Sequence, residues 1–88
     1  MPEQIKEEKL IGEIIHYFGK IGVAVIRLSD TLRLGDTIKI VGGEDTEFTQ
    51  EVESMEIDHQ KIEEAKPGDD VGLKVIKKVR EGYKVYKV

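Results

Sequence analysis

The residues that could hold a metal ion are two histidines separated by 42 positions. His16 and His59 are the only imidazoles, and Asp58 beside His59 is the nearest acidic companion. The chain has no cysteine, so thiolate zinc sites and disulfides are excluded. Protein zinc sites use three or four ligands, commonly at short spacing, and this pair does not match them. We expect His16 on a strand surface, His59 in a long loop, and neither a metal nor a cofactor.

The carboxylates are numerous, and we expect them to form a solvated face. They include Glu44, Asp45, Glu51, Glu53, Glu63, Glu64, Asp69 and Asp70. General acid–base catalysis needs two carboxyl groups that converge in a pocket and have separated pKa values. Ser29 and Ser54 have no His–Asp constellation in the sequence that could activate a hydroxyl. The sequence therefore predicts that the chain is not an enzyme and takes no small-molecule substrate.

Six cations could form a binding surface for nucleic acid or a partner. They are Lys20, Arg27, Lys74, Lys77, Lys78 and Arg80. If the fold brings them together they make a basic stripe, in which a guanidinium suits phosphate and the tyrosines with Phe18 could stack on unpaired bases. The alternative is that lysines along a strand only keep a sheet edge soluble.

Composition limits the possible partners. The net charge is −4, which argues against indiscriminate nucleic-acid binding but leaves room for a local basic patch. No apolar run reaches the roughly 18 residues of a membrane span, and the N-terminus MPEQIKEEKL does not resemble a signal peptide. We expect a cytoplasmic protein without membrane contact. The abundance of Lys and Glu, with no Asn, Cys or Trp, favours a thermophilic source.

The segments that would position these residues are short and β-like. Turn residues recur at short intervals between runs rich in Val, Ile, Thr, Phe and Tyr, which is typical of a small all-β domain. Strands are expected at 10–17, 21–28, 37–41, 47–57, 71–76 and 83–88. Residues 21–28 are apolar on both faces, which predicts a strand covered on both sides. A change of phase after Val52 predicts a bulge near Glu53 and Ser54.

The first of these strands has an alternative. Ile11, Ile14, Ile15 and Phe18 recur at the spacing of an amphipathic helix over residues 3–18. Gly12 and the β-branched content favour a strand. We therefore predict a polar lead-in at residues 1–9 and one domain over residues 10–88.

Pro67 and Gly68 predict a type II turn before the fifth strand. Proline cannot donate to a sheet ladder, and the glycine supplies the positive φ that this turn requires. Gly72, inside the following strand, marks a bend or a close backbone approach.

Several of these motifs resemble known families. Gly22–Val25, Arg27-Leu28, the Leu-x-x-Gly-Asp turn at residues 32–36 and residues 65–73 are similar to the second domain of translational GTPases such as elongation factor Tu. The runs HYFGKIGVAVIRL and VESMEIDHQKIEEAKPGDDVGLKV more closely resemble the C-terminal barrel of the U32 peptidase family, over about residues 10–88.

The resemblance implies an all-β, six-stranded, closed antiparallel Greek-key barrel of the elongation-factor domain 2 type. Ile26 stands where translation factors often have glycine, which counts against transfer of the aminoacyl-tRNA pocket. The chain contains neither a GTPase phosphate loop nor the U32 catalytic region.

Two functions follow from this interpretation. The first is a non-catalytic module that contacts tRNA, the ribosome or a translation-associated protein. The second is a protein–protein adaptor that docks a separately encoded U32-like enzyme. A third possibility is that the chain is a piece of a longer protein, although Met1 and the completed final strand argue mildly against it.

Overall fold

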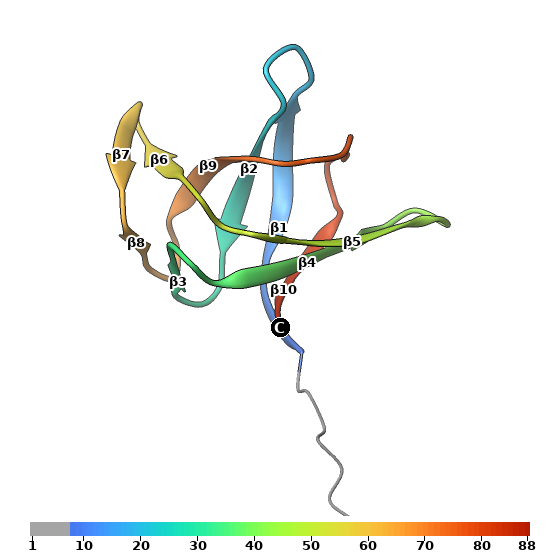
Figure 1. Cartoon of the computed structure of the whole chain (residues 1–88), viewed down its shortest axis with the longest axis horizontal. Helices are drawn as coiled ribbons and strands as arrows, with labels where there is room; N and C mark the ends of the chain where they lie inside the picture. Colours follow the sequence, from blue (N-terminus) through green and yellow to red (C-terminus); the bar gives the residue numbers. More distant parts are fainter. Residues whose placement is uncertain (1–7) are drawn as a thin grey trace, which may run out of the picture.

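The structure is a computed structural model that describes residues 8–88. These residues form ten β-strands (Figure 1). Their bounds are β1 Lys9–Phe18, β2 Val23–Leu28, β3 Leu32–Arg33, β4 Thr37–Gly42, β5 Thr46–Glu51, β6 Met55–Ile57, β7 Gln60–Ile62, β8 Glu64–Ala65, β9 Asp70–Lys74 and β10 Lys84–Lys87. The described part holds no helix that is long and apolar enough to cross a membrane.

The all-β prediction is confirmed, but the prediction of a closed barrel is wrong. Eight strands form one antiparallel sheet in the order β5-β4-β10-β1-β2-β9-β6-β7, and β3 and β8 form a separate pair. The two ends of this order, β5 and β7, are not joined by a backbone ladder within residues 8–88. The sheet is therefore open, although Figure 1 shows that it curls around the core.

The chain leaves strand geometry between β5 and β6, so the edge strand β5 does not continue into the β6–β7 end of the sheet. Residues 52–54 belong to no strand, at the place where the sequence predicted a bulge in one long strand. On the β9 side, the Gln50 side chain takes the place of a ladder. Its Nε2 donates to the Lys74 carbonyl at 2.7 Å, and its Oε1 accepts from the Ile76 N–H at 2.9 Å. A side chain thus bridges the gap that backbone pairing would have closed.

Strand β1 explains the helix-like spacing of its sequence. Its register shifts between Leu10 and Gly12 against β10, and between Ile14 and His16 against β2. Each irregularity adds a residue on β1, so the inward side chains recur every third residue instead of every second. Ile11 and Ile14 are fully buried, and Tyr17 packs against the same core. A bulged strand therefore imitates part of the periodicity of a helix.

Two turns position the strands on either side of β2. The β1–β2 loop closes with the Gly22 N–H donating to the Phe18 carbonyl at 2.9 Å, and Gly22 has a φ of 69°. The turn at Pro67-Gly68 forms as predicted: the Asp69 N–H donates to the Lys66 carbonyl at 3.0 Å, and the φ of Gly68 is 93°. The Gly68 N–H also donates to the Leu28 carbonyl at 2.8 Å, which ties the turn to the end of β2.

The core is entirely apolar within residues 8–88. The segment between β9 and β10 crosses one end of it, as the orange trace in Figure 1 shows, and places Val79 inside with 3% exposure. Its far end joins β1, because the Ile14 N–H donates to the Tyr83 carbonyl at 2.8 Å and the Gly82 N–H to the Ile14 carbonyl at 2.7 Å. Three of the predicted cations, Lys77, Lys78 and Arg80, lie on this segment, and a fourth, Lys74, is the last residue of β9 before it.

Candidate functional site

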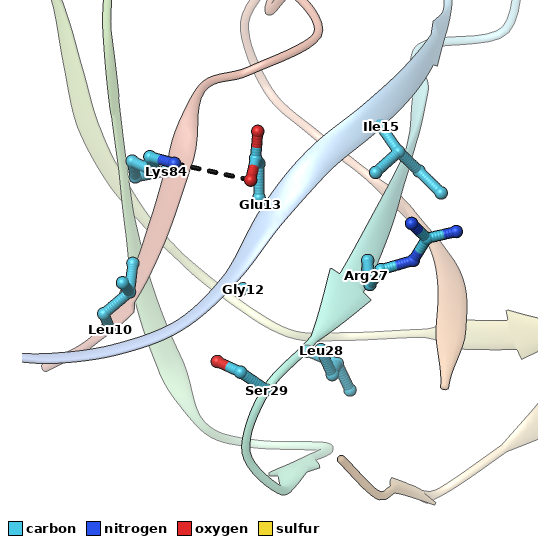
Figure 2. Close-up of a pocket in the computed structure, with 8 residues that line it drawn as sticks. All are labelled: Leu10, Gly12, Glu13, Ile15, Arg27, Leu28, Ser29 and Lys84. Atoms are coloured by element: carbon cyan, nitrogen blue, oxygen red, sulfur yellow. Dashed lines mark ion pairs between the residues drawn. The ribbon is translucent and has the colours of Figure 1, made fainter. Parts of the chain in front are cut away.

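A groove lies on the outer face of the sheet, where β10, β1 and β2 run side by side (Figure 2). It has a volume of about 500 Å³. Its lining residues are Leu10, Gly12, Glu13, Ile15, Arg27, Leu28, Ser29 and Lys84. Gly12 also lines it, and a Cβ added there would lie 2.8 Å from the Arg27 carbonyl oxygen and 2.8 Å from Cγ2 of the buried Ile26.

A row of alternating charges crosses this groove. The register aligns Lys84 of β10 with Glu13 of β1, Glu13 with Arg27 of β2, and Arg27 with Asp70 of β9. Lys84 Nζ lies 3.3 Å from Glu13 Oε1, and Arg27 Nε lies 3.1 Å from Asp70 Oδ1. The hydrogen bond and charge of Asp70, with a smaller contribution from Glu13, raise the pKa of the Arg27 guanidinium above its ordinary value. Each charge in the row therefore has an opposite neighbour.

This arrangement suits binding through shape and apolar contact more than recognition of a single charge. A phosphate or carboxylate would have to compete with Asp70 for Arg27 and with Glu13 for Lys84. The exposed pairs themselves contribute little stability, typically below about 1 kcal/mol each. The charged side chains that line the groove are therefore paired, and the row that crosses it carries no excess of either charge.

The six predicted cations do not form one stripe. Arg27 lies in the charge row near the lower end of β2, whereas Lys20 and Lys74 lie at the opposite end of the sheet, in or beside the β1–β2 loop. Lys77, Lys78 and Arg80 lie on the segment that crosses the core, and the buried Val79 separates the last two. Lys77 Nζ lies 5.8 Å from the centre of the Phe48 ring, at a distance that allows a cation–π contact.

Exposed apolar side chains gather at the same end as Lys20 and Lys74. Phe18 is opposite Val23, and Val23 is opposite Lys74, so these three share one row on the outer face. The Val75 N–H donates to the Gly22 carbonyl at 3.0 Å, which brings the β1–β2 loop next to residues 75 and 76. We call the group formed by Phe18, Lys20, Ile21, Lys74 and Ile76 the hairpin-end patch.

The isoleucines of this patch are the most exposed large apolar side chains of the described chain. Ile21 is 61% exposed, Ile76 is 67% exposed and Phe18 is 47% exposed. The sequence interpretation missed the patch, because it took Ile21 as the first residue of one strand and Ile76 as the last residue of another. A signal was present: Ile21 stands between Lys20 and Gly22 in a turn, where an apolar residue has no core to enter.

His16 lies on strand β1 as expected, whereas the prediction that His59 lies in a long loop is wrong. The His16 ring is stacked at a tilt on Phe18, with 4.3 Å between ring centres, and its Nδ1 lies 3.6 Å from Glu81 Oε2. His59 lies in the two-residue turn between β6 and β7, with a φ of 65°. Within residues 8–88, no group of three or more metal-binding side chains comes together.

No family profile matches the chain, but individual proteins do. An uncharacterized protease of Methanocaldococcus jannaschii is 42% identical over 76 residues, which cover 86% of this chain and 19% of that protein. A collagenase of Porphyromonas gingivalis is 32% identical over 83 residues, which cover 93% of this chain and 23% of that protein. The chain thus spans only about a fifth of the length of these curated relatives.

Solved structures agree in fold. The C-terminal domain of a U32 peptidase from Geobacillus thermoleovorans superimposes with a TM-score of 0.85, at 23% identity, over 91% of this chain and 92% of that domain.

Elongation factor 1-alpha of Methanopyrus kandleri is 37% identical over 57 residues, which cover 65% of this chain and 13% of that protein. This shorter match does not confirm the translation-factor assignment, whereas the likeness to a U32 C-terminal domain is confirmed at the level of the fold.

These relatives overturn the prediction that the chain is not an enzyme. The proteins that align with most of it are named as a protease and as collagenases. The prediction was drawn from the carboxylates and serines of 88 residues alone, and these residues carry no mark of the longer proteins in which such a domain occurs.

Proposed function

We propose that the chain is the C-terminal β-domain of a peptidase of the U32 type and serves proteolysis by contacting the remainder of that peptidase. The observation that carries the proposal is the pattern of coverage. The structural superposition covers 92% of the length of a U32 C-terminal domain. The sequence alignment covers only 19% of the length of the Methanocaldococcus protease. A segment with these proportions corresponds to one domain of a multidomain protein.

The geometry of the described residues supports a contact role. The interior is filled by apolar side chains, so contact must occur on the outer surface. That surface offers the groove across β10, β1 and β2 and the hairpin-end patch. An exposed apolar cluster on a small domain is a common mark of a protein interface.

A domain exchange in the Porphyromonas collagenase tests the proposal. Three proteins are compared: the intact collagenase, a form that lacks the segment aligned with this chain, and a chimera in which this chain replaces that segment. We expect the deletion to lower collagen cleavage and the chimera to restore it. Circular dichroism of all three proteins controls for folding.

Two outcomes would contradict the proposal. If the deletion cleaves collagen as fast as the intact enzyme, the domain does not serve proteolysis. If the folded chimera cleaves collagen as slowly as the deletion does, this chain does not perform that role.

RNA contact, the other partner expected from the sequence, has weaker support. Arg27 is paired with Asp70, and the net charge of −4 argues against indiscriminate binding to phosphates. Binding of labelled tRNA at two salt concentrations serves as a comparison. Saturable, salt-sensitive binding would favour the RNA role over the peptidase role.

A further inference from the structure

We infer that the hairpin-end patch docks this domain on an apolar surface with an acidic rim, presented by the remainder of the peptidase. The inference rests on the proposed function and adds the surface and the chemistry of the partner. The patch comprises Phe18, Lys20, Ile21, Lys74 and Ile76, from the β1–β2 hairpin and the end of β9.

Hydrogen bonds hold the backbone that carries the apolar part of the patch. Ile21 lies in a loop closed by two hydrogen bonds to the Phe18 carbonyl, from the Ile21 N–H at 3.3 Å and the Gly22 N–H at 2.9 Å. Ile76 is fixed by its N–H bond to Gln50 Oε1 at 2.9 Å. A preformed surface loses little conformational entropy on binding, which favours a specific contact.

The outer face of β2 extends this apolar surface. Val23 and Val25 point away from the core and are half-buried, whereas the sequence predicted a strand covered on both sides. Gly72 lies opposite Val25 and leaves it uncovered by any side chain on that strand. Strand β2 thus has the sequence of a strand that is covered on both faces, but residues 8–88 supply no layer that covers its outer face. A docked partner would supply that layer.

The charges specify what lies around the partner's apolar surface. Elsewhere in the described chain, Lys9, Arg27, Arg33, Lys39, Lys84 and Lys87 each form an ion pair with a carboxylate. Lys20 and Lys74 form none with residues 8–88, and the same holds for Lys61, Lys66, Lys77, Lys78 and Arg80. On a protein with a net charge of −4, two unneutralised lysines beside exposed isoleucines favour a partner that brings carboxylates.

Charge also argues against a second copy of this chain as the partner. A symmetric contact through the patch would bring the Lys20 and Lys74 side chains of both copies into one interface. Like charges across an interface are unfavourable, so self-association at this patch is disfavoured.

Hydrogen exchange in the collagenase chimera tests the docking surface without any substitution. In the chimera, amides of residues 17–23 and 74–77 should exchange at least about tenfold more slowly than in the isolated chain. Residues 60–66, on β7 and β8 outside the patch, serve as the internal reference and should exchange alike in both proteins.

Charge reversal provides the second measurement. Lys20→Glu with Lys74→Glu should abolish the added protection. Lys61→Glu with Lys66→Glu makes the same charge change at exposed sites outside the patch and should preserve it. Ile21→Ser with Ile76→Ser should also abolish the protection, whereas Leu34→Ser, at another exposed apolar position, should not.

The possible results separate the two proposals. An active chimera whose patch amides exchange as in the isolated chain overturns the docking surface and leaves the proposed function standing. A folded but inactive chimera overturns both. A third result would show that the partner is wrong. In it, the isolated chain binds tRNA or phosphatidylglycerol vesicles, the patch variants lose this binding, and the patch amides are not protected in the chimera.

Discussion

The side chain of Gln50 holds the backbone of Ile76 in place across the open seam of the sheet, with 2.9 Å between Gln50 Oε1 and the Ile76 nitrogen. The same amide donates to the Lys74 carbonyl at 2.7 Å. One residue of β5 therefore fixes both ends of the Lys74–Ile76 segment. This contact links the opening of the sheet to the shape of the hairpin-end patch.

Replacing Gln50 should destabilise the domain and loosen the patch. Gln50→Ala removes two hydrogen bonds to backbone groups, each worth roughly 0.5–1.5 kcal/mol, so we expect a loss of about 1–3 kcal/mol in the free energy of unfolding. Urea denaturation measures it. Gln60→Ala, on exposed β7, is the control and should change stability by less than about 0.5 kcal/mol. Equal stability of the two variants would show that the Gln50 bridge contributes nothing.

Gly12 of β1 and Gly72 of β9 should respond differently to alanine. At Gly12 a Cβ would lie 2.8 Å from the Arg27 carbonyl oxygen, which belongs to the backbone and cannot move aside. We expect Gly12→Ala to cost about 1–3 kcal/mol, as overpacking does. At Gly72 the nearest atom would be Val23 Cγ1 at 3.5 Å, an ordinary contact, so Gly72→Ala should be close to neutral. Thermal unfolding of both variants compares them, and a reversed order would contradict this packing.

The sequence predicted the strands better than their closure. Alternation at Thr37–Ile40 and the Pro67-Gly68 turn are local signals, and both correspond to the structure. The short strands β3, β7 and β8 were missed because two or three residues carry no periodicity. Closure would need a backbone ladder between β5 and β7, the two ends of the strand order, and no pattern along the chain records whether strands so far apart pair.

The site was predicted less well than the fold. Counting lysines suggested a stripe, but ion pairing depends on cross-strand neighbours, and the register places Asp70 beside Arg27. Exposure of Ile21 and Ile76 depends on where the strands end, and each of these ends lies two residues inside the predicted limit. Such small shifts at strand ends move a side chain from the core to the surface.

The turn between β6 and β7 should be improved by glycine. Asp58 and His59 have φ values of 53° and 65°, a left-handed conformation that suits glycine in two-residue hairpins. His59→Gly should relieve about 1 kcal/mol of strain and raise the melting temperature by roughly 4–8 °C. Lys61→Gly, in the adjoining strand β7, should lower it. A lower melting temperature for His59→Gly would mean that the imidazole makes a stabilising contact.

The Lys9–Asp30 pair should make stability depend on pH at the acidic end. Lys9 Nζ lies 2.6 Å from Asp30 Oδ2, and this hydrogen bond, with one from the Thr31 N–H, lowers the pKa of Asp30 below its ordinary value of 3.8. A lowered pKa in the folded state means that the pair stabilises the fold above pH 3.8, and that this stabilisation is lost as the pH falls through the folded-state value.

Asp30→Asn should therefore be less stable than the wild type near neutral pH, and the difference should shrink as the pH falls below 3.8. Urea midpoints across the acidic range measure it. Asp45→Asn is the control, because Asp45 forms no ion pair within residues 8–88 and should match the wild type throughout. A difference for Asp30→Asn that persists unchanged at the lowest pH would rule out this pair as its cause.

A crystal structure of the collagenase chimera tests the central claim most directly. The account predicts that Ile21 and Ile76, 61% and 67% exposed in this structure, become buried against an apolar surface of the peptidase, with carboxylates facing Lys20 and Lys74. A chimera in which both isoleucines stay exposed, or in which another face of the domain is buried, would contradict it.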